Sequence, residues 1–376
     1  MSSRTLIAII SLVCAFNIAA TAETTEKEFK VSPGQRLDVD LKTGGSLTVV
    51  GWDKDIVKVK YDIRGRDAEE CQVEIEQASG GVRVSSHYEG RRNNSNTNAD
   101  FEINVPRKFN LELFTMGGGI RLENIEGTIE GKTMGGRLDL TKLKGNLDLT
   151  TMGGRVSLTD SDVDGNVKTM GGAMNVENVT GDVKATSMGG KVTQKNVRRR
   201  SGAEIRDEVN IKTMGGDIDV DDAPEGADVH TMGGDIHIVR AQKYARVKTM
   251  GGDIVIDAVD GSVRAVTMGG NINVKMVGNP AEGDRAIAVE SMGGDVTVVV
   301  PSALSMDLDI TLAYTRDARD EYNIISDFEI KKEATQEWER GKGSPRKYIY
   351  GTGVISGGKH KVTIKTINGN VYLKKG

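Results

Sequence analysis

Hydrophobic and polar residues alternate in short runs through the middle of the chain, and glycine-rich corners separate the runs. Residues 133–141 and 142–150 show the pattern best, because each stretch ends in Leu-Asp-Leu-Thr, with its two leucines two residues apart. Alternation with a period of two is typical of a strand with one buried face, and glycine suits a tight corner. We therefore predict structural repeats that each contain two nonapeptide turn-plus-strand units.

A longer period runs through the same region. The tetrapeptide Thr/Ser-Met-Gly-Gly, hereafter the motif, occurs ten times, mostly at intervals of eighteen residues. Its methionines are Met116, Met134, Met152, Met170, Met188, Met214, Met232, Met250, Met268 and Met292. Two longer intervals predict protruding loops at residues 198–208 and 278–284. An eighteen-residue unit cannot bury an apolar face alone, whereas stacked units can, so we predict an all-β fold, a β-solenoid of about 18-residue coils.

Aromatic residues distinguish the ends of the chain from its middle. Residues 23–114 contain seven of them, whereas residues 115–313 contain only Tyr244. We interpret 23–114 as an N-terminal β cap that shields the first coil from edge pairing, and 115–300 as the β-solenoid repeats. Residues 301–376 are expected to form a C-terminal β cap with a final divergent repeat, in which Thr-Ile-Asn-Gly replaces the motif.

Residues 1–22 have the features of a secretory signal peptide. Arg4 supplies a positive charge, an apolar run follows at 6–18, and small residues at 20–22 precede Glu23. The run is shorter than the roughly 18 residues that a membrane-spanning helix needs, and no comparable run occurs later. We expect an exported protein of the periplasm or cell surface, without a transmembrane segment after signal cleavage.

The charge and the cysteine content argue against nucleic-acid binding and against an intramolecular disulfide. The chain has 50 basic and 54 acidic residues, a net charge of −4, and the two signs are mixed along the sequence. A nucleic-acid partner is not expected, because it would need a clustered basic face. Signal cleavage would leave Cys71 as the one remaining thiol, so we expect no intramolecular disulfide.

The methionines are the first candidates for chemistry. A stack of thioethers suits a soft ion such as Cu(I). However, Leu143, Val179 and Val259 stand at the position that we align with the methionine in the second half of a repeat. This alignment predicts that the methionines are buried corners of the core. The threonines before them are expected to form a stabilising hydroxyl ladder.

Charged residues after the two glycines are expected to point outward. Their sign changes along the array, from Arg137, Arg155 and Lys191 to Asp217, Asp235, Asp253 and Asp295. Stacked acids repel one another unless they are neutralised, so Asp217, Asp235 and Asp253 are weak candidate Ca²⁺ ligands, and a solvated surface stripe is the favoured interpretation. The calcium β-roll pattern itself is absent. Arg198, Arg199 and Arg200 in the first loop form a candidate partner contact.

An enzyme is the alternative hypothesis, because many secreted β-helices cleave polysaccharides with carboxylates and stacking aromatics. Aromatic residues are almost absent from the predicted walls, and no nucleophile elbow, P-loop or dinucleotide motif occurs. The histidines (His87, His230, His237 and His360) lack the spacing of a zinc site. We therefore expect no enzymatic activity, no cofactor and no resident metal. Self-assembly into filaments is a third possibility, which the signal peptide and the aromatic-rich ends disfavour.

Several short segments resemble a known family. Gly51-Trp52-Asp53 follows the first predicted strand pair, Val105-Pro106 precedes the array, and Thr-Ile-Asn-Gly-Asn-Val-Tyr-Leu closes the chain. Together with the glycine-led repeats they resemble the bacterial adhesin-like β-strand-repeat family of unknown function, which is related to auto-transporter adhesin head domains. The resemblance implies a non-enzymatic, adhesin-like or structural binding scaffold of the cell envelope. Its partner would be an unknown envelope protein or a glycan.

Overall fold

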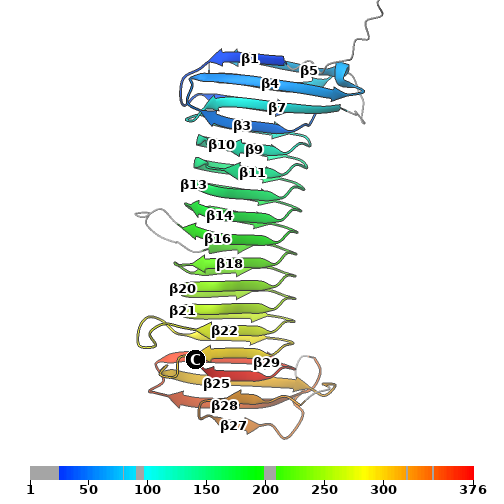
Figure 1. Cartoon of the computed structure of the whole chain (residues 1–376). Coiled ribbons are helices and arrows are strands. Elements are labelled where there is room, and N and C mark those ends of the chain that lie inside the picture. Colours follow the sequence, from blue (N-terminus) through cyan, green and yellow to red (C-terminus); the bar gives the residue numbers. More distant parts are fainter. Residues whose placement is uncertain (1–24, 79, 90–96, 199–208, 319–320, 341–342) are drawn as a thin grey trace, which may run out of the picture.

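The chain folds into a straight rod of stacked strands (Figure 1). This computed structural model describes residues 25–78, 80–89, 97–198, 209–318, 321–340 and 343–376. The predicted all-β class is confirmed: within these ranges the only helical element is the 3₁₀ turn η1 (Ala68–Glu70). No helix in the described ranges has the length and apolar character needed to cross a membrane. The predicted signal peptide, residues 1–22, lies outside them.

The middle of the rod is a parallel stack in which each strand pairs with the strand of the next coil. Pairing of β10 with β12, for example, joins Glu126 to Lys144 and Thr133 to Thr151, an offset of one 18-residue repeat. Each coil contributes one strand after its motif, to the first wall, and one strand before the next motif, to the second wall.

The strands of the stack have the following bounds. The first wall contains β9 (Ile120–Glu123), β11 (Leu138–Thr141), β14 (Met174–Thr180), β16 (Val192–Arg198), β18 (Ile218–Ala223), β22 (Ile272–Met276) and β24 (Val296–Val300). The second wall contains β8 (Asn110–Thr115), β10 (Glu126–Thr133), β12 (Lys144–Thr151), β15 (Val183–Ser187), β17 (Val209–Lys212), β19 (Ala227–His230) and β23 (Ile287–Ser291). Three strands continue from the first wall into the second: β13 (Val156–Thr169), β20 (Ile236–Lys248) and β21 (Ile254–Thr267).

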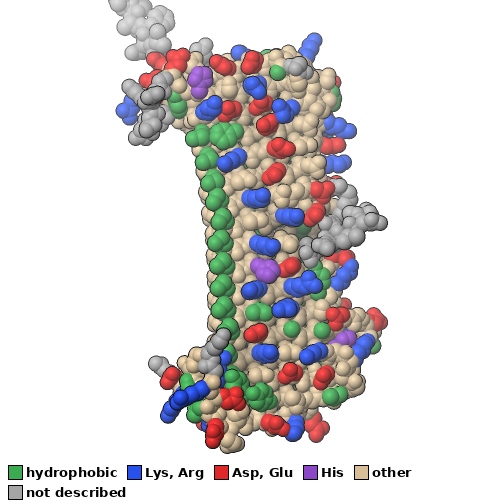
Figure 2. Space-filling model, turned by 180° about the vertical axis from the view of Figure 1, so that it is seen from behind, with side chains coloured by type: hydrophobic (Ala, Val, Ile, Leu, Met, Phe, Trp, Pro, Cys, Tyr) green, Lys and Arg blue, Asp and Glu red, His purple; other side chains and the backbone are tan. Residues whose placement is uncertain are grey.

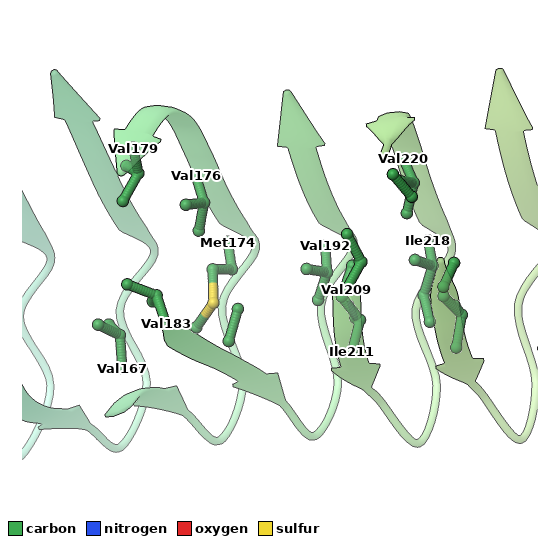
Figure 3. Packing of buried hydrophobic residues seen from close by; sticks show 14 of the residues in the cluster. Val167, Met174, Val176, Val179, Val183, Val192, Val209, Ile211, Ile218 and Val220 are labelled. Atoms are coloured by element: carbon green, nitrogen blue, oxygen red, sulfur yellow. The ribbon is translucent and has the colours of Figure 1, made fainter. Parts of the chain in front are cut away.

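The core lies between the two walls. Alternate side chains of each strand point inward (Figure 3). Val176 and Ile218 of the first wall point towards the second wall, which carries Val183 and Ile211. These side chains are completely or almost completely buried. Burial of one such side chain contributes about 1.5–3 kcal/mol, and the contribution repeats in every coil. Stacking is therefore what holds eighteen-residue units together.

The N-terminal end closes the stack with its own first strands. Seven strands lie here: β1 (Thr25–Lys30), β2 (Arg36–Leu41), β3 (Leu47–Trp52), β4 (Ile56–Gly65), β5 (Cys71–Ala78), β6 (Gly81–Tyr88) and β7 (Thr97–Pro106). The pair β2 and β3 lies in parallel between β8 and β9 on one side and β6 and β7 on the other. β1 and β4 then pair antiparallel, as do β4 and β7, and β5 and β6.

The C-terminal end has a similar arrangement, in which the last two strands of the chain lie between the stack and strands that precede them in the sequence. Its strands are β25 (Met306–Thr315), β26 (Ile324–Ser326), β27 (Lys331–Ala334), β28 (Arg346–Ile355), β29 (His360–Ile367) and β30 (Val371–Lys375). The last pair, β29 and β30, lies between β23 and β24 on one side and β25 and β26 on the other. Thr366 donates to the carbonyl of Gly294 at 2.6 Å, so this corner is built like those of the motif. Antiparallel strands β28 and β27 follow β25 outward.

Candidate functional site

The threonine and the second glycine of the motif form the inner side of each corner. The Thr231 side chain is buried; its hydroxyl donates to the carbonyl of Gly216 in the preceding coil at 2.9 Å and accepts from the N–H of Gly234 at 3.3 Å. A Cβ on Gly234 would overlap the carbonyl of Gly216. The same pair of hydrogen bonds recurs in other coils. The expected hydroxyl ladder therefore consists of hydroxyl-to-backbone bonds, and it requires both residues.

The methionines lie on the outer side of the corner, and the prediction that they are buried is wrong. Nine of the ten are 38–50% exposed, and Met152 is half-buried. Together they form a continuous apolar ridge along one edge of the rod, the methionine ridge (Figure 2). Leu143, Val179 and Val259 do lie in the core, but at the opposite corner. At the motif corner the threonine occupies the buried position, so the methionine after it faces solvent.

The first glycine of the motif also lies outside the packed interior. A Cβ on Gly233 would approach no neighbouring atom closer than 3.5 Å, which is ordinary van der Waals contact. In the last corner of the chain, Ile367 takes the place of the methionine, and Asn368, which has a left-handed φ of 52°, takes the place of this glycine. The fold thus accepts other residues at both outer positions, although the motif keeps them identical.

The charged positions after the motif lie on the outer face of the first wall, where every member is exposed or half-buried: Arg137, Arg155, Lys191, Asp217, Asp235, Asp253 and Asp295. The late carboxylates accept backbone hydrogen bonds from the next coil. Asp217 accepts from the N–H of Asp235 at 3.0 Å, Asp235 from Asp253 at 2.8 Å, and Asp253 from Asn271 at 2.7 Å. Backbone amides therefore offset part of the repulsion that the sequence suggested an ion would neutralise.

Calcium binding by Asp217, Asp235 and Asp253 remains a prediction. Within the described ranges, no three His, Cys, Asp or Glu side chains are placed to hold a common metal ion. The arginine cluster also remains a prediction, because Arg199 and Arg200 lie outside the described residues. Arg198, the last residue of β16, is exposed and pairs with Thr180 of the preceding coil.

A basic surface on the outside of the second wall was missed by the sequence analysis. It consists of the exposed residues Lys168, Lys184, Lys212, Arg246, Lys248 and Arg264, hereafter the basic wall. Register brings them together: Lys212 and Lys248 flank His230, and Arg246 pairs with Arg264. Figure 2 shows Lys and Arg side chains scattered along the rod beside the methionine ridge. Aligning the coils at eighteen residues would have revealed these columns, which the overall charge balance conceals.

A hollow of about 270 Å³ opens at one end of the basic wall. Its lining includes Tyr244, Arg246, Arg264, Asp284 and Lys361. The Arg246 guanidinium lies 4.8 Å from the centroid of the Tyr244 ring, within the range of a cation–π contact. Three cations, one carboxylate and an aromatic ring thus face a shared opening, which suits a polar ligand with negative charge.

One rim of this hollow is organised by a buried arginine. Arg285 is 3% exposed and donates to the carbonyls of Val277, Asn279 and Glu282 at 2.7–2.9 Å. It also forms a salt bridge of 2.5 Å with Asp260 of the preceding coil. The predicted loop at 278–284 is therefore held against the array by one guanidinium, and it brings Asp284 to the hollow.

The perturbed titratable groups keep their ordinary charge at neutral pH. Burial is the main cause that lowers the pKa of His360, whose Nδ1 accepts from the N–H of Arg285, so the ring is neutral. Burial raises the pKa of the Cys71 thiol, which favours its protonated form. The hydrogen bond to Asp219 raises the pKa of Lys191, which is a cation in any case. None of these shifts produces the acid–base or nucleophilic group that catalysis at neutral pH would use.

The two neighbouring histidines of the sequence do not meet in the structure. His230 belongs to the second wall and its Nε2 lies 2.6 Å from Asp228. His237 belongs to the first wall and its Nε2 lies 2.7 Å from Asp257. Because each histidine pairs with its own carboxylate on a separate wall, they form no common zinc or catalytic site.

Comparison with solved structures finds similarity to proposed adhesins from Parabacteroides and Bacteroides species. One from Parabacteroides merdae is 11% identical, with 68% of this chain and 97% of that chain covered and a TM-score of 0.37. One from Parabacteroides distasonis is 12% identical, with coverages of 71% and 97% and a TM-score of 0.33. One from Bacteroides fragilis is 16% identical, with coverages of 65% and 98% and a TM-score of 0.29. No curated protein matches the chain.

Comparison with protein families gives a direct match. The model of the family described as Toastrack DUF4097 matches residues 166–374, which is more than half of the chain. The matched segment begins in β13 and ends in β30, so it contains most of the parallel stack and the C-terminal end. The chain therefore belongs to the Toastrack DUF4097 family.

Proposed function

We propose that this protein is an exported, non-enzymatic β-solenoid scaffold of the bacterial cell envelope, and that its basic wall binds an anionic glycan. Residues 1–22 are the signal peptide of this proposal. Residues 23–114 and 301–376 are the caps of the solenoid at 115–300, and they prevent its open edges from pairing with other chains. Kinship with auto-transporter adhesin heads remains a prediction.

The hollow at Tyr244, Arg246, Arg264 and Lys361 is the observation that supports glycan binding. Its cations attract sulfate or carboxylate groups, and the aromatic ring offers an apolar face to a sugar. Because the hollow lies on an exposed strand surface, a long polymer can pass over it without threading an end. An extended wall also allows several charged units to bind along the rod, which raises avidity.

Binding of dextran sulfate and of uncharged dextran to the chain from Glu23 tests the proposal. We expect calorimetry to show binding of dextran sulfate only, and added salt to weaken it, because exposed charges are screened. The triple variant Arg246→Gln, Arg264→Gln, Lys361→Gln should lose about tenfold or more in affinity, which corresponds to about 1.4 kcal/mol.

The matched control removes an equal number of positive charges, two arginines and one lysine, from the first wall: Arg137→Gln, Arg155→Gln and Lys191→Gln. It should bind dextran sulfate nearly as tightly as the unaltered chain. Equal loss in both triple variants would reduce the interaction to general charge attraction and overturn the assigned site. Release of new reducing ends from any polysaccharide tested would instead favour the enzyme alternative.

A further inference from the structure

We propose that the methionine ridge binds soft monovalent metal ions of the Cu(I) class, through thioether sulfurs supplied by neighbouring coils. Thioethers are the side-chain donors that select Cu(I) over Mg²⁺, Ca²⁺ and Mn²⁺, which prefer oxygen ligands. The ridge is separate from the hollow on the basic wall, so this inference does not depend on glycan binding.

The first observation is that the same residue, methionine, recurs at an exposed position of the motif. The methionine is the same in all ten copies of the motif, although the fold does not need it there. Three residues later, another outward position of the same coils carries a different residue in many of them: Gly119, Arg137, Arg155, Ala173, Lys191, Asp217, Asp235, Asp253, Asn271 and Asp295. Recent duplication of the repeat would have preserved both positions. A constant methionine beside a variable neighbour favours a role for the methionine outside the fold.

Regular spacing is the second observation. For five ridge methionines the N–H donates to the carbonyl of the motif threonine one coil earlier, at 3.1–3.2 Å: Met134, Met152, Met170, Met188 and Met292. This register places successive methionines about 4.8 Å apart along the rod. Methionine has three rotatable side-chain bonds, so the sulfurs of two or three adjacent coils can converge on one ion.

The methionine sulfurs are accessible, and the charge of the residues near them changes along the ridge. The glycine that follows each methionine has no side chain to cover the sulfur, and in every coil except that of Gly251 a Cβ there would make only ordinary contacts. Just past the corners of Met214, Met232 and Met250 lie Asp217, Asp235 and Asp253. Just past three earlier corners lie Arg137, Arg155 and Lys191. A cation is electrostatically favoured near the carboxylates, so the later half of the ridge should fill first.

Titration of the chain from Glu23 with Ag(I), a soft ion without Cu(I) redox chemistry, tests the proposal; Cys71 is replaced by serine throughout, because its free thiol would compete for the ion. Two or three sulfurs per ion give roughly three to five bound ions for ten methionines. Binding should persist at pH 5, because a thioether does not titrate whereas a histidine with an ordinary pKa of about 6.5 becomes protonated. Anaerobic Cu(I) competition against bathocuproine disulfonate should give the same stoichiometry.

Two sets of variants separate the ridge from other methionines. Met214→Leu, Met232→Leu, Met250→Leu and Met268→Leu together preserve the apolar ridge but remove four sulfurs, and the highest-affinity ions should be lost. Met174→Leu with Met276→Leu changes two buried methionines outside the motif, and should bind as many ions as the unaltered chain. Circular dichroism confirms that each variant retains its β structure.

The proposal is overturned if the four-leucine variant binds Ag(I) with unchanged stoichiometry and affinity. It is also overturned if the unaltered chain binds less than one ion, or if its ions are released at pH 5. In these cases the ridge would act through its apolar surface alone. Loss of glycan binding in the basic-wall variant, with Ag(I) binding intact, would leave this inference standing.

Discussion

The inner and outer halves of the motif differ in what they contribute to the molecule. The inner half, exemplified by Thr231 and Gly234, is buried, connects consecutive coils by hydrogen bonds and has no room for another side chain. The outer half, Met232 and Gly233, is exposed and has room for other side chains. Repetition alone therefore does not reveal a structural role, because four equally repeated residues divide into two that build the rod and two that it merely displays.

Alanine at the two glycines of one motif should give the largest contrast. Gly234→Ala forces a Cβ against the Gly216 carbonyl, and the expected loss in the free energy of unfolding is about 3 kcal/mol, the upper range for overpacking. Gly233→Ala should change it by less than about 0.5 kcal/mol. Denaturant unfolding of both variants measures the difference, and similar losses would break the division into inner and outer halves.

Removal of the hydroxyl from the same corner should have a smaller effect. Thr231→Val keeps the shape of the side chain but leaves the Gly216 carbonyl and the Gly234 N–H without this partner. Loss of buried hydrogen bonds of this kind costs about 1–2 kcal/mol. Thr231→Ser serves as the control, because it retains the hydroxyl, and should recover most of the stability. If valine were as stable as threonine, the hydroxyl ladder would not support the stack.

The periodicity of the sequence predicted much of the fold. Alternation and the eighteen-residue interval indicated short strands in an all-β chain, since both follow directly from which side chains must be buried. The outward orientation of the methionine could not be predicted from this periodicity. Two corners with similar glycine patterns bury different positions, Thr133 at one and Leu143 at the other, and only backbone geometry distinguishes them.

The candidate sites were harder to predict, because they depend on register between coils. Arg246 and Arg264 are neighbours across two strands, yet each is an isolated charge in the sequence. Tyr244 stands out in the sequence as the one aromatic residue of the middle of the chain, but its position beside Arg246 at the hollow depends on the register. The role of Arg285 in fixing its loop arises from carbonyl groups, which leave no trace in a residue pattern.

Oxidation of methionine by dilute hydrogen peroxide, mapped by peptide mass spectrometry on the folded chain, tests the central claim most directly. Each accessible sulfur gains one oxygen atom from peroxide and water is released. The nine exposed ridge methionines should be oxidised rapidly, whereas Met174, Met276 and Met306, which are buried between the walls or strands, should be oxidised slowly. Protection of the ridge methionines to the level of Met174 would contradict an exposed outer half and would remove the basis for metal binding there.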